Sequence, residues 1–334
     1  MSELLVVLLA GLAALAALVA TLGYVAYHGM IRYRMRDEAY QRQAGLESGD
    51  FDASVFDLPW VEENILSKGG YPLRAHALAA DGSGAPKLAV FHHGIGWGWL
   101  GMIRYMELFR AEGWTVVAYD SRGHSGSSGA PEARARRSAR AKPARPSYGF
   151  FEKEDLKSVV DWSFDRFGNK GGAAGRGARP RLVVFGESMG AATALQYAPL
   201  DPRVDAVIAD CPFSSATGEL EYRLKAAMVP PGFRKLVILA ADAFCRCLEG
   251  FSLRDADPSR AILETSVPIF FIHGLEDRYV PWRMSVVMAE RRRRVLPNAI
   301  TELLLVPGAR HAGSIREDKA RYAAALREFL EKAL

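Results

Sequence analysis

Cysteine is scarce in this sequence, and the few cysteines present form no recognisable pattern. There are three in 334 residues, namely Cys211, Cys245 and Cys247. An odd set whose last two members stand two positions apart predicts no disulfide framework, because side chains at this spacing do not face each other on a helix. The spacing also lacks the paired Cys or His ligands that a tetrahedral zinc ion needs. We therefore expect free thiols that pack as small apolar residues, and no metal site.

Motifs for two further classes of ligand are missing. Lys and Arg outnumber Asp and Glu by only 43 to 38, a net charge of +5, and no nucleic-acid-binding motif accompanies this excess. The glycine-rich stretch 172–179 lacks the Lys-Ser/Thr ending of a Walker phosphate-binding loop. Nucleic acid is therefore not expected among the partners.

The excess of positive charge comes largely from two local clusters. Their members are Arg134, Arg136, Arg137, Arg140, Lys142 and Arg145 in the first, and Lys170, Arg176 and Arg179 in the second. We interpret both as flexible insertions. Near a membrane they could bind anionic lipid headgroups, at about 1 kcal/mol per residue, and otherwise they are solvated basic loops.

The beginning of the chain lacks the basic residues of a secretory signal peptide. An uncharged apolar run extends from Leu4 to Tyr27 and is long enough, as a helix, to cross a hydrocarbon core of roughly 30 Å. A signal peptide would start with Lys or Arg and have a shorter apolar core, so cleavage is disfavoured. Three arginines follow the run, at Arg32, Arg34 and Arg36. By the positive-inside rule they predict a single-pass anchor whose C-terminal side is cytoplasmic.

A Gly-x-Ser-x-Gly motif, residues 186–190, stands between the apolar run 182–185 and the helix-like segment 191–195. A strand that reverses sharply into a helix holds its turn residue in a strained backbone geometry, and glycines on either side let the two elements approach. Ser188 would thereby be presented for chemistry. The backbone N–H of Met189 would lie at a helix N-terminus, where it can point at a developing oxyanion.

Candidates for a general base and for an acid that orients it follow downstream, and a serine nucleophile needs both. The apolar strand 267–272 runs into His273-Gly274-Leu275-Glu276-Asp277, so Asp277 follows the C-terminal end of a strand, where ligands meet parallel sheets. The strand 300–306 runs into a loop that ends at His311, the only histidine after Asp277. The alternatives are that Glu276 is the acid, that Asp277 only forms a turn, and that His311 caps a helix.

In chain order and in local pattern these residues resemble the α/β-hydrolase superfamily. Its triad follows the order Ser, Asp, His, and its acid and base commonly stand in the patterns Gly-x-x-Asp-x-x-Val-Pro and Gly-x-x-His, which occur here at 274–281 and 308–311. The resemblance implies that Ser188 is the nucleophile, that His311 is the general base and then the general acid, and that Asp277 fixes the tautomer of the imidazole.

The strand 88–91 ends in His92-His93-Gly94-Ile95-Gly96, which resembles the superfamily's oxyanion loop. Ile95 would then donate the second N–H beside Met189. We expect His92 and His93 to be structural and to bond loop carbonyls. The following turn, 120–126, resembles a superfamily turn that we interpret as scaffold. Two tryptophans stand just after the loop, Trp97 and Trp99. They are candidate walls of an apolar substrate pocket, and the alternative is that they pack beneath the loop as core.

A rival hypothesis rests on the same loop, because residues 96–101 match Gly-x-Gly-x-x-Gly, with Asp120 about twenty residues further on. This pattern is typical of a dinucleotide-binding oxidoreductase. The two indoles would crowd the approach that the glycines should clear, and this hypothesis leaves the Ser, Asp and His candidates unexplained. A third class, a non-catalytic membrane-tethered module on a hydrolase fold, is disfavoured by the intact triad pattern.

The alternation of strands and helices predicts an α/β-hydrolase fold, a doubly wound and mostly parallel sheet. We expect a transmembrane anchor at 1–30, a juxtamembrane linker at 31–60, and a hydrolase domain at 61–334 that starts with a hairpin at 61–79 and carries a small helical cap at about 214–265.

The whole resembles bacterial membrane-anchored hydrolases of the serine-aminopeptidase-like group. This resemblance implies a cofactor-free serine hydrolase on the cytoplasmic side of a membrane. It would cleave an ester or thioester of a small-molecule or lipid-like acyl substrate, with a serine aminopeptidase or amidase as the alternative.

Overall fold

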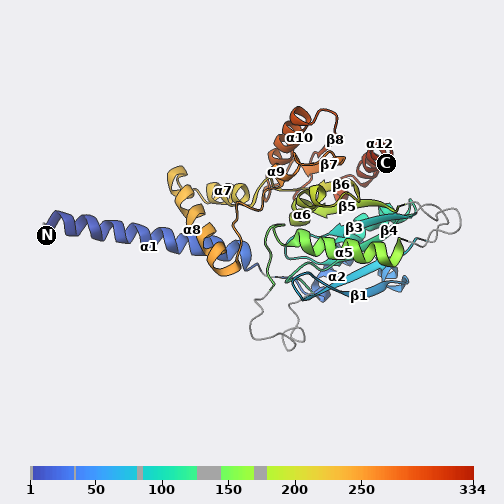
Figure 1. Cartoon of the computed structure of the whole chain (residues 1–334), viewed down its shortest axis with the longest axis horizontal. Helices are drawn as coiled ribbons and strands as arrows, with labels where there is room; N and C mark the ends of the chain where they lie inside the picture. The colour runs from blue at the N-terminus through green and yellow to red at the C-terminus, as the bar shows by residue number, and fades with distance from the viewer. Residues whose placement is uncertain (1–2, 34, 81–85, 126–143, 169–178) are drawn as a thin grey trace. The chain divides into compact units, whose positions relative to one another are not determined.

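The computed structural model describes residues 3–33, 35–80, 86–125, 144–168 and 179–334. The chain forms two compact units (Figure 1). The larger comprises residues 34–214 and 257–334, and the smaller comprises residues 1–33 and 215–256. Most members of the two basic clusters lie outside the described residues. Of the two that are described, Arg145 and Arg179, the second forms an ion pair with Asp205.

An eight-stranded sheet organises the larger unit, in the order β1-β2-β4-β3-β5-β6-β7-β8. Its strands are β1 (Val61–Leu66), β2 (Pro72–Leu78), β3 (Lys87–His92), β4 (Thr115–Tyr119), β5 (Arg181–Glu187), β6 (Val204–Asp210), β7 (Ile269–Gly274) and β8 (Thr301–Val306). The pairs β1–β2 and β2–β4 are antiparallel, and all later pairs are parallel. The predicted hairpin and the mostly parallel sheet are therefore confirmed.

Helices cover both faces of this sheet because successive side chains of a buried strand point to opposite sides. The helices of the larger unit are α2 (Glu38–Glu47), α3 (Ile103–Arg110), α5 (Glu152–Phe167), α6 (Met189–Tyr197), α9 (Pro258–Ala261), α10 (Arg283–Val295), α11 (Ser314–Glu317) and α12 (Lys319–Ala333), with 3-10 turns η1 (Ala53–Asp57), η2 (Trp99–Met102) and η3 (Ala198–Leu200). In β5, Phe185 packs into a cluster with residues of α3 and α12, whereas Val184 packs into one with residues of α5, α6 and α10. This two-sided core is the predicted doubly wound architecture.

The segment 31–60, expected to be a linker, contains regular structure. Both α2 and η1 lie in it, and residues 34–60 belong to the larger unit. Phe51 and Val55 are buried in the same core cluster as Trp99. The apolar residues of this segment are few and irregularly spaced, so no helical period indicated a packed element.

The smaller unit consists of α1 (Glu3–Ile31), α7 (Ala216–Ala226) and α8 (Pro231–Glu249). Among the described helices, α1 alone is long and apolar enough to cross a membrane, and signal sequences share that length and composition. Its C-terminal part packs on α8, where a Cβ atom on Gly23 would lie 2.3 Å from the Cβ atom of Ala240. The ring of Phe244 contacts those of Tyr24 and Tyr27. The segment predicted to be a helical cap, about 214–265, contains the helices α7 and α8, and its last residues, 257–265, belong to the larger unit.

Candidate active site

The turn from β5 into α6 has the strained geometry expected of a nucleophile elbow. Ser188 lies there with φ of 54° and ψ of −114°, a region that costs a non-glycine residue free energy. The glycines on either side are required sterically. A Cβ atom on Gly186 would lie 2.2 Å from the carbonyl oxygen of Gly190, and one on Gly190 would lie 1.9 Å from that of His92. The tight packing of α6 on β3 therefore holds Ser188 at the C-terminal edge of the sheet.

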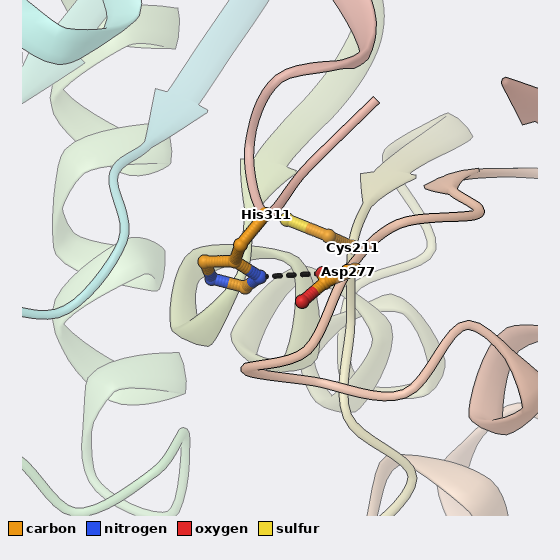
Figure 2. A group of neighbouring side chains, drawn as sticks. All are labelled: Cys211, Asp277 and His311. Carbon is orange, nitrogen blue, oxygen red and sulfur yellow. Dashed lines mark hydrogen bonds and ion pairs between the residues drawn. The ribbon is translucent and has the colours of Figure 1, made fainter. Parts of the chain in front are cut away.

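The structure brings Ser188, His311 and Asp277 into one hydrogen-bonded chain. The His311 Nε2 atom lies 2.9 Å from Ser188 Oγ. Its Nδ1 atom lies 2.6 Å from Asp277 Oδ2, and Figure 2 shows this second contact. An ionised carboxylate only accepts hydrogen bonds, so Nδ1 carries the ring proton and Nε2 accepts the hydroxyl proton of Ser188. These three side chains come from loops after β5, β7 and β8, which meet at one edge of the sheet.

Asp277 is held as an ionised acceptor. Its Oδ1 atom accepts the backbone N–H groups of Tyr279 at 2.8 Å and Val280 at 2.9 Å. Burial acts to raise the pKa of Asp277, but hydrogen bonds from His273 and His311 outweigh it and hold the pKa well below its ordinary value. Glu276, the alternative acid, is exposed, and its backbone N–H donates to Ala309.

His273 is a second histidine on the same carboxylate that sequence analysis did not single out. Its Nε2 atom lies 3.1 Å from Asp277 Oδ2 and 3.0 Å from the carbonyl oxygen of Val280, and its Nδ1 atom lies 2.7 Å from Ser285 Oγ. Two acceptors at Nε2 place the proton there, so the hydroxyl of Ser285 donates to Nδ1. The His-Gly-x-x-Asp spacing, visible in the sequence, was the available signal.

The loop after β3 lies directly against the serine. A Cβ atom on Gly94 would lie 3.4 Å from that of Ser188. In the parts of the chain that the structure describes, neither the Ile95 nor the Met189 backbone N–H donates a hydrogen bond. Both residues are buried, and buried N–H groups rarely lack a partner. Two unpaired donors beside Ser188 are what an oxyanion site requires.

The histidines of this loop are structural, as predicted. His92 Nδ1 donates to the carbonyl oxygen of His93, and His93 Nδ1 donates to that of Gly94. His93 Nε2 accepts the backbone N–H of Ser121 at 2.9 Å. Burial lowers the pKa of His92 to about 4 and lowers that of His93 well below its ordinary value, so both rings stay neutral.

The two tryptophans occupy different environments. Trp99 is 4% exposed, stacks on His76 at a ring distance of 3.8 Å, and makes an edge contact with Trp60. It therefore packs beneath the loop as part of the core, which was the alternative to a pocket wall. Trp97 is only partly buried, and the guanidinium of Arg36 lies 4.8 Å from its ring centroid.

A buried polar cluster beside the elbow was missed by sequence analysis. Arg104 of α3 donates to Glu187 Oε2 at 2.5 Å and to the carbonyl oxygen of Ala312 at 3.1 Å. It thereby ties the residue before Ser188 to the residue after His311. Nearby, burial and the charge of Glu187 raise the pKa of Asp210 to about 7. Hydrogen bonds from tyrosine hydroxyls act in the opposite direction and lower this pKa, but they do not outweigh the other two causes. No short motif marks this cluster, because its members come from distant segments.

Cys211 lies beside the hydrogen-bonded chain (Figure 2). Its sulfur, one oxygen of Asp277 and one ring nitrogen of His311 lie within 4.8 Å of one another. Burial and nearby carboxylates raise the pKa of the Cys211 thiol well above its ordinary value, and a neutral thiol is a poor metal ligand. Both nitrogens of His311 are already hydrogen-bonded. These donors fit an acid–base chain better than a metal site.

A cavity of about 650 Å³ lies elsewhere in the larger unit. It is formed by α3, α12 and the strand ends at Lys87 and Arg181, with Phe109, Trp114 and Leu330 among its lining residues. No candidate catalytic or oxyanion residue lines it, so the chemistry proposed for Ser188 does not take place there.

Comparison with known proteins identifies the family of this chain. The model of the Alpha/beta hydrolase family matches residues 89–325. The uncharacterized protein YqkD of Bacillus subtilis (strain 168) is 32% identical over 269 residues, which cover 80% of this chain and 78% of YqkD.

Among solved structures, the esterase Pf2001 of Pyrococcus furiosus superposes with a TM-score of 0.61 at 21% identity, over 85% of this chain and 94% of that one. The acylaminoacyl peptidase of Pyrococcus horikoshii gives a TM-score of 0.60 at 18% identity, over 85% of this chain and 44% of the peptidase. At these identities the solved structures establish a shared fold.

This chain belongs to the alpha/beta hydrolase family and is a hydrolase. Its candidate site lies where ligands approach parallel sheets, beyond the carboxyl ends of the strands.

Proposed function

We propose that this protein is a serine hydrolase that cleaves a carboxylic ester or thioester through an acyl-enzyme. One observation carries the proposal: the strained Ser188 hydroxyl lies within hydrogen-bond distance of His311, which in turn contacts Asp277. The strained backbone at Ser188 and the buried carboxylate of Asp277 both cost free energy, and strain of this kind is typical of active sites. Membership of a hydrolase family gives the arrangement a catalytic role that accounts for this cost.

In the proposed reaction, His311 Nε2 takes the proton of Ser188 as Oγ attacks the substrate carbonyl carbon. The negative charge that forms on the carbonyl oxygen is stabilised by the Ile95 and Met189 N–H groups. The imidazolium of His311, stabilised by Asp277, then gives its proton to the leaving alkoxide or thiolate. A water molecule, deprotonated by His311, then attacks the acyl carbon, and His311 returns that proton to Ser188 Oγ as the acyl–oxygen bond breaks and the acid is released.

Serine aminopeptidase or amidase activity is the second candidate, because the same chain of residues can protonate a leaving amine. It is favoured by the fold shared with an acylaminoacyl peptidase, and the ester proposal by the fold shared with an esterase. The two candidates differ in the leaving group. An alkoxide or thiolate leaves more readily than an amine, because an amine leaves only after His311 has transferred a proton to it.

The dinucleotide-binding hypothesis finds less support. In a pyrophosphate loop the glycines leave the backbone accessible. Here a Cβ atom on Gly98 would lie 2.5 Å from Asp120 Oδ1 and 2.6 Å from Ser125 Oγ, and the N–H of Gly96 donates to His124 Nε2. The glycine spacing is therefore used for close packing against neighbouring loops.

We also propose that α1 anchors the protein in a membrane, with the hydrolase unit on the cytoplasmic side. The support is an apolar helix of 29 residues followed by three arginines. A substrate with an acyl or other lipid-like group fits this location, and the partly buried Trp97 is the tryptophan available to such a group.

A substrate panel on the full-length protein tests the proposal. p-Nitrophenyl esters and acyl thioesters of increasing chain length are compared with aminoacyl and peptidyl amides. We expect turnover of esters and thioesters, with chain-length dependence of up to about 0.8 kcal/mol per buried methylene. Ser188→Ala should abolish it, whereas Ser158→Ala, at a half-buried position on α5, should not. Activity confined to amides rejects the esterase assignment and supports the second candidate.

A further inference from the structure

The segment between the candidate membrane anchor and the sheet is bonded directly to the loop that carries Ile95. The backbone N–H of Arg36 donates to the carbonyl oxygen of Gly96 at 3.0 Å. Gln41, on α2, donates through Nε2 to the carbonyl oxygen of Arg36 at 2.9 Å and to Ser125 Oγ at 2.8 Å. Gln41 is 1% exposed, and both hydrogen bonds are partly buried.

Side chains of the same segment also contact the loop. The guanidinium of Arg36 lies 4.8 Å from the ring centroid of Trp97 and 5.7 Å from that of Tyr40. A Cβ atom on Gly98 would lie 3.1 Å from Gln41 Oε1, which shows how closely α2 packs on the loop. The segment therefore makes polar, cationic and packing contacts with residues 96–98.

These contacts determine the orientation of the peptide groups that follow Ile95. The N–H of Gly96 is fixed from one side by His124 Nε2 at 3.1 Å, and its carbonyl oxygen is fixed from the other side by Arg36. Gly96 itself has φ of 80°, a conformation that a glycine adopts freely and that gives the loop little stiffness of its own. The bond from Arg36 is therefore a contact that holds the Gly96 carbonyl from outside the loop, in addition to the bond within the loop from the Trp97 N–H to the carbonyl oxygen of Gly94 at 3.3 Å.

The other end of the segment reaches the serine and histidine loops. Asp50 Oδ2 accepts a hydrogen bond from Arg104 Nη1 at 3.0 Å. Arg104 in turn contacts Glu187, which precedes Ser188, and Ala312, which follows His311. One short stretch of chain thus supports the loops of both the oxyanion donor and the nucleophile.

We propose that residues 36–50 form a positioning element of the active site, and that Arg36 and Gln41 set the direction of the Ile95 N–H toward the oxyanion. This inference rests on the proposed serine hydrolase function. In this role neither residue needs to contact the substrate. Their effect passes through Gly96, and it acts on the transition state, in which the oxyanion is fully formed, more than on substrate binding.

Two glutamines on α2 provide a matched pair for the test. Gln41→Ala removes two partly buried hydrogen bonds, whereas Gln43→Ala removes only an exposed contact with Glu47. We expect Gln41→Ala to lower kcat by about tenfold to a hundredfold, less than the about 10²–10³ that follows loss of an oxyanion donor. KM should change less than threefold. Gln43→Ala should leave both constants unchanged.

A second pair isolates the backbone hydrogen bond. Arg36→Pro removes the backbone N–H that donates to the carbonyl oxygen of Gly96. Arg36→Ala keeps this N–H and removes the guanidinium. We expect kcat of Arg36→Pro to be at least tenfold lower than that of Arg36→Ala. A trifluoromethyl ketone analogue of the substrate, which forms an oxyanion with Ser188, should lose affinity in proportion to kcat for all four variants. A purely structural role would change melting temperature without this proportionality.

The outcomes separate this inference from the proposed function. Wild-type turnover together with unchanged kcat and unchanged ketone affinity in Gln41→Ala and Arg36→Pro overturns the positioning role alone. Absence of ester, thioester and amide turnover in the wild-type protein overturns both. Loss of kcat in Gln41→Ala and Arg36→Pro, with melting temperatures within a few degrees of wild type, supports the positioning role.

Discussion

His273 and His311 contact the same oxygen of Asp277, His273 through Nε2 at 3.1 Å and His311 through Nδ1 at 2.6 Å. The carboxylate therefore receives hydrogen bonds from two imidazoles as well as from the backbone. Such an acceptor stays ionised and keeps a fixed position, and both properties are required of a group that orients a catalytic imidazole.

The identity of the acid gives the first prediction. Asp277→Asn should lower kcat by about 10⁴, because a neutral amide no longer holds the proton of His311 on Nδ1. Glu276→Gln should leave kcat unchanged, because that side chain is exposed and its backbone makes the contact with Ala309. Steady-state kinetics of the two purified variants on one ester decide the matter. If Glu276→Gln is the damaged variant, the acid has been assigned to the wrong residue.

The role of His273 gives a prediction on stability and pH. The pKa of Asp277 is lower in the folded state than its ordinary value of 3.8, so its contribution to stability is complete above that pH and is lost as pH falls through the folded pKa. His273→Phe removes one hydrogen bond that lowers this pKa. The free energy of unfolding at pH 7 should then fall, by about 1.4 kcal/mol for each unit by which the pKa rises.

The carbon-13 chemical shift of the Asp277 carboxyl group, followed in the folded protein as pH falls from 7, measures this effect. The pKa of Asp277 should be higher in His273→Phe than in wild type, and this comparison does not depend on the packing cost of the substitution. A carboxyl group that titrates at the same pH in both proteins would show that His273 does not stabilise the ionised Asp277.

Asp210 should produce the opposite dependence on pH. Its pKa of about 7 in the folded state lies above the ordinary 3.8, so the folded protein holds a proton there that the unfolded chain has lost. Stability therefore decreases as pH rises through this window, by at most about 1.4 kcal/mol per pH unit. Asp210→Asn imitates the protonated form, so its stability relative to wild type should increase from about pH 4 to about pH 7. Chemical denaturation across this range measures the difference, and a relative stability that declines contradicts the assignment.

Membrane orientation can be tested with the chain's own cysteines. Cys247 is exposed, whereas Cys211 and Cys245 are buried. If α1 spans the membrane with its C-terminal side in the cytoplasm, a membrane-impermeant maleimide should label Cys247 in inside-out vesicles and not in intact spheroplasts. A Cys247→Ser variant gives the background. Labelling in spheroplasts alone would place the hydrolase unit outside, and recovery of the protein without α1 would identify α1 as a cleaved signal sequence.

The strands and the three residues of the hydrogen-bonded chain could be predicted because their signals are local. Each of the three residues comes just after an apolar run, either directly or at the end of a short loop: Ser188, Asp277 and His311. The carboxyl ends of parallel strands meet at one edge of a sheet, so residues at these positions come together. The placement of these residues at one edge of the sheet therefore follows from the strand ends that the sequence marks.

The supporting contacts could not be predicted in this way. Arg104 and Glu187 are 83 positions apart, and Gln41 and Ser125 are 84 apart. Each pair meets only after the sheet has formed, and no short pattern of residues encodes its contact. The sequence of α2 is mostly polar, so its packing on the loop after β3 was not visible either. Trp99 illustrates the same limit, because its burial depends on Trp60 and His76 from distant segments.

Active-site labelling tests the central claim most directly. The full-length protein is treated with a fluorophosphonate probe, and the modified residue is mapped by peptide mass spectrometry. The account predicts one adduct, on Ser188, which is lost in Ser188→Ala and strongly slowed in His311→Ala, while Ser158→Ala is labelled as fast as wild type. A folded wild-type protein that is not labelled, or an adduct that persists on another residue in Ser188→Ala, would contradict the account.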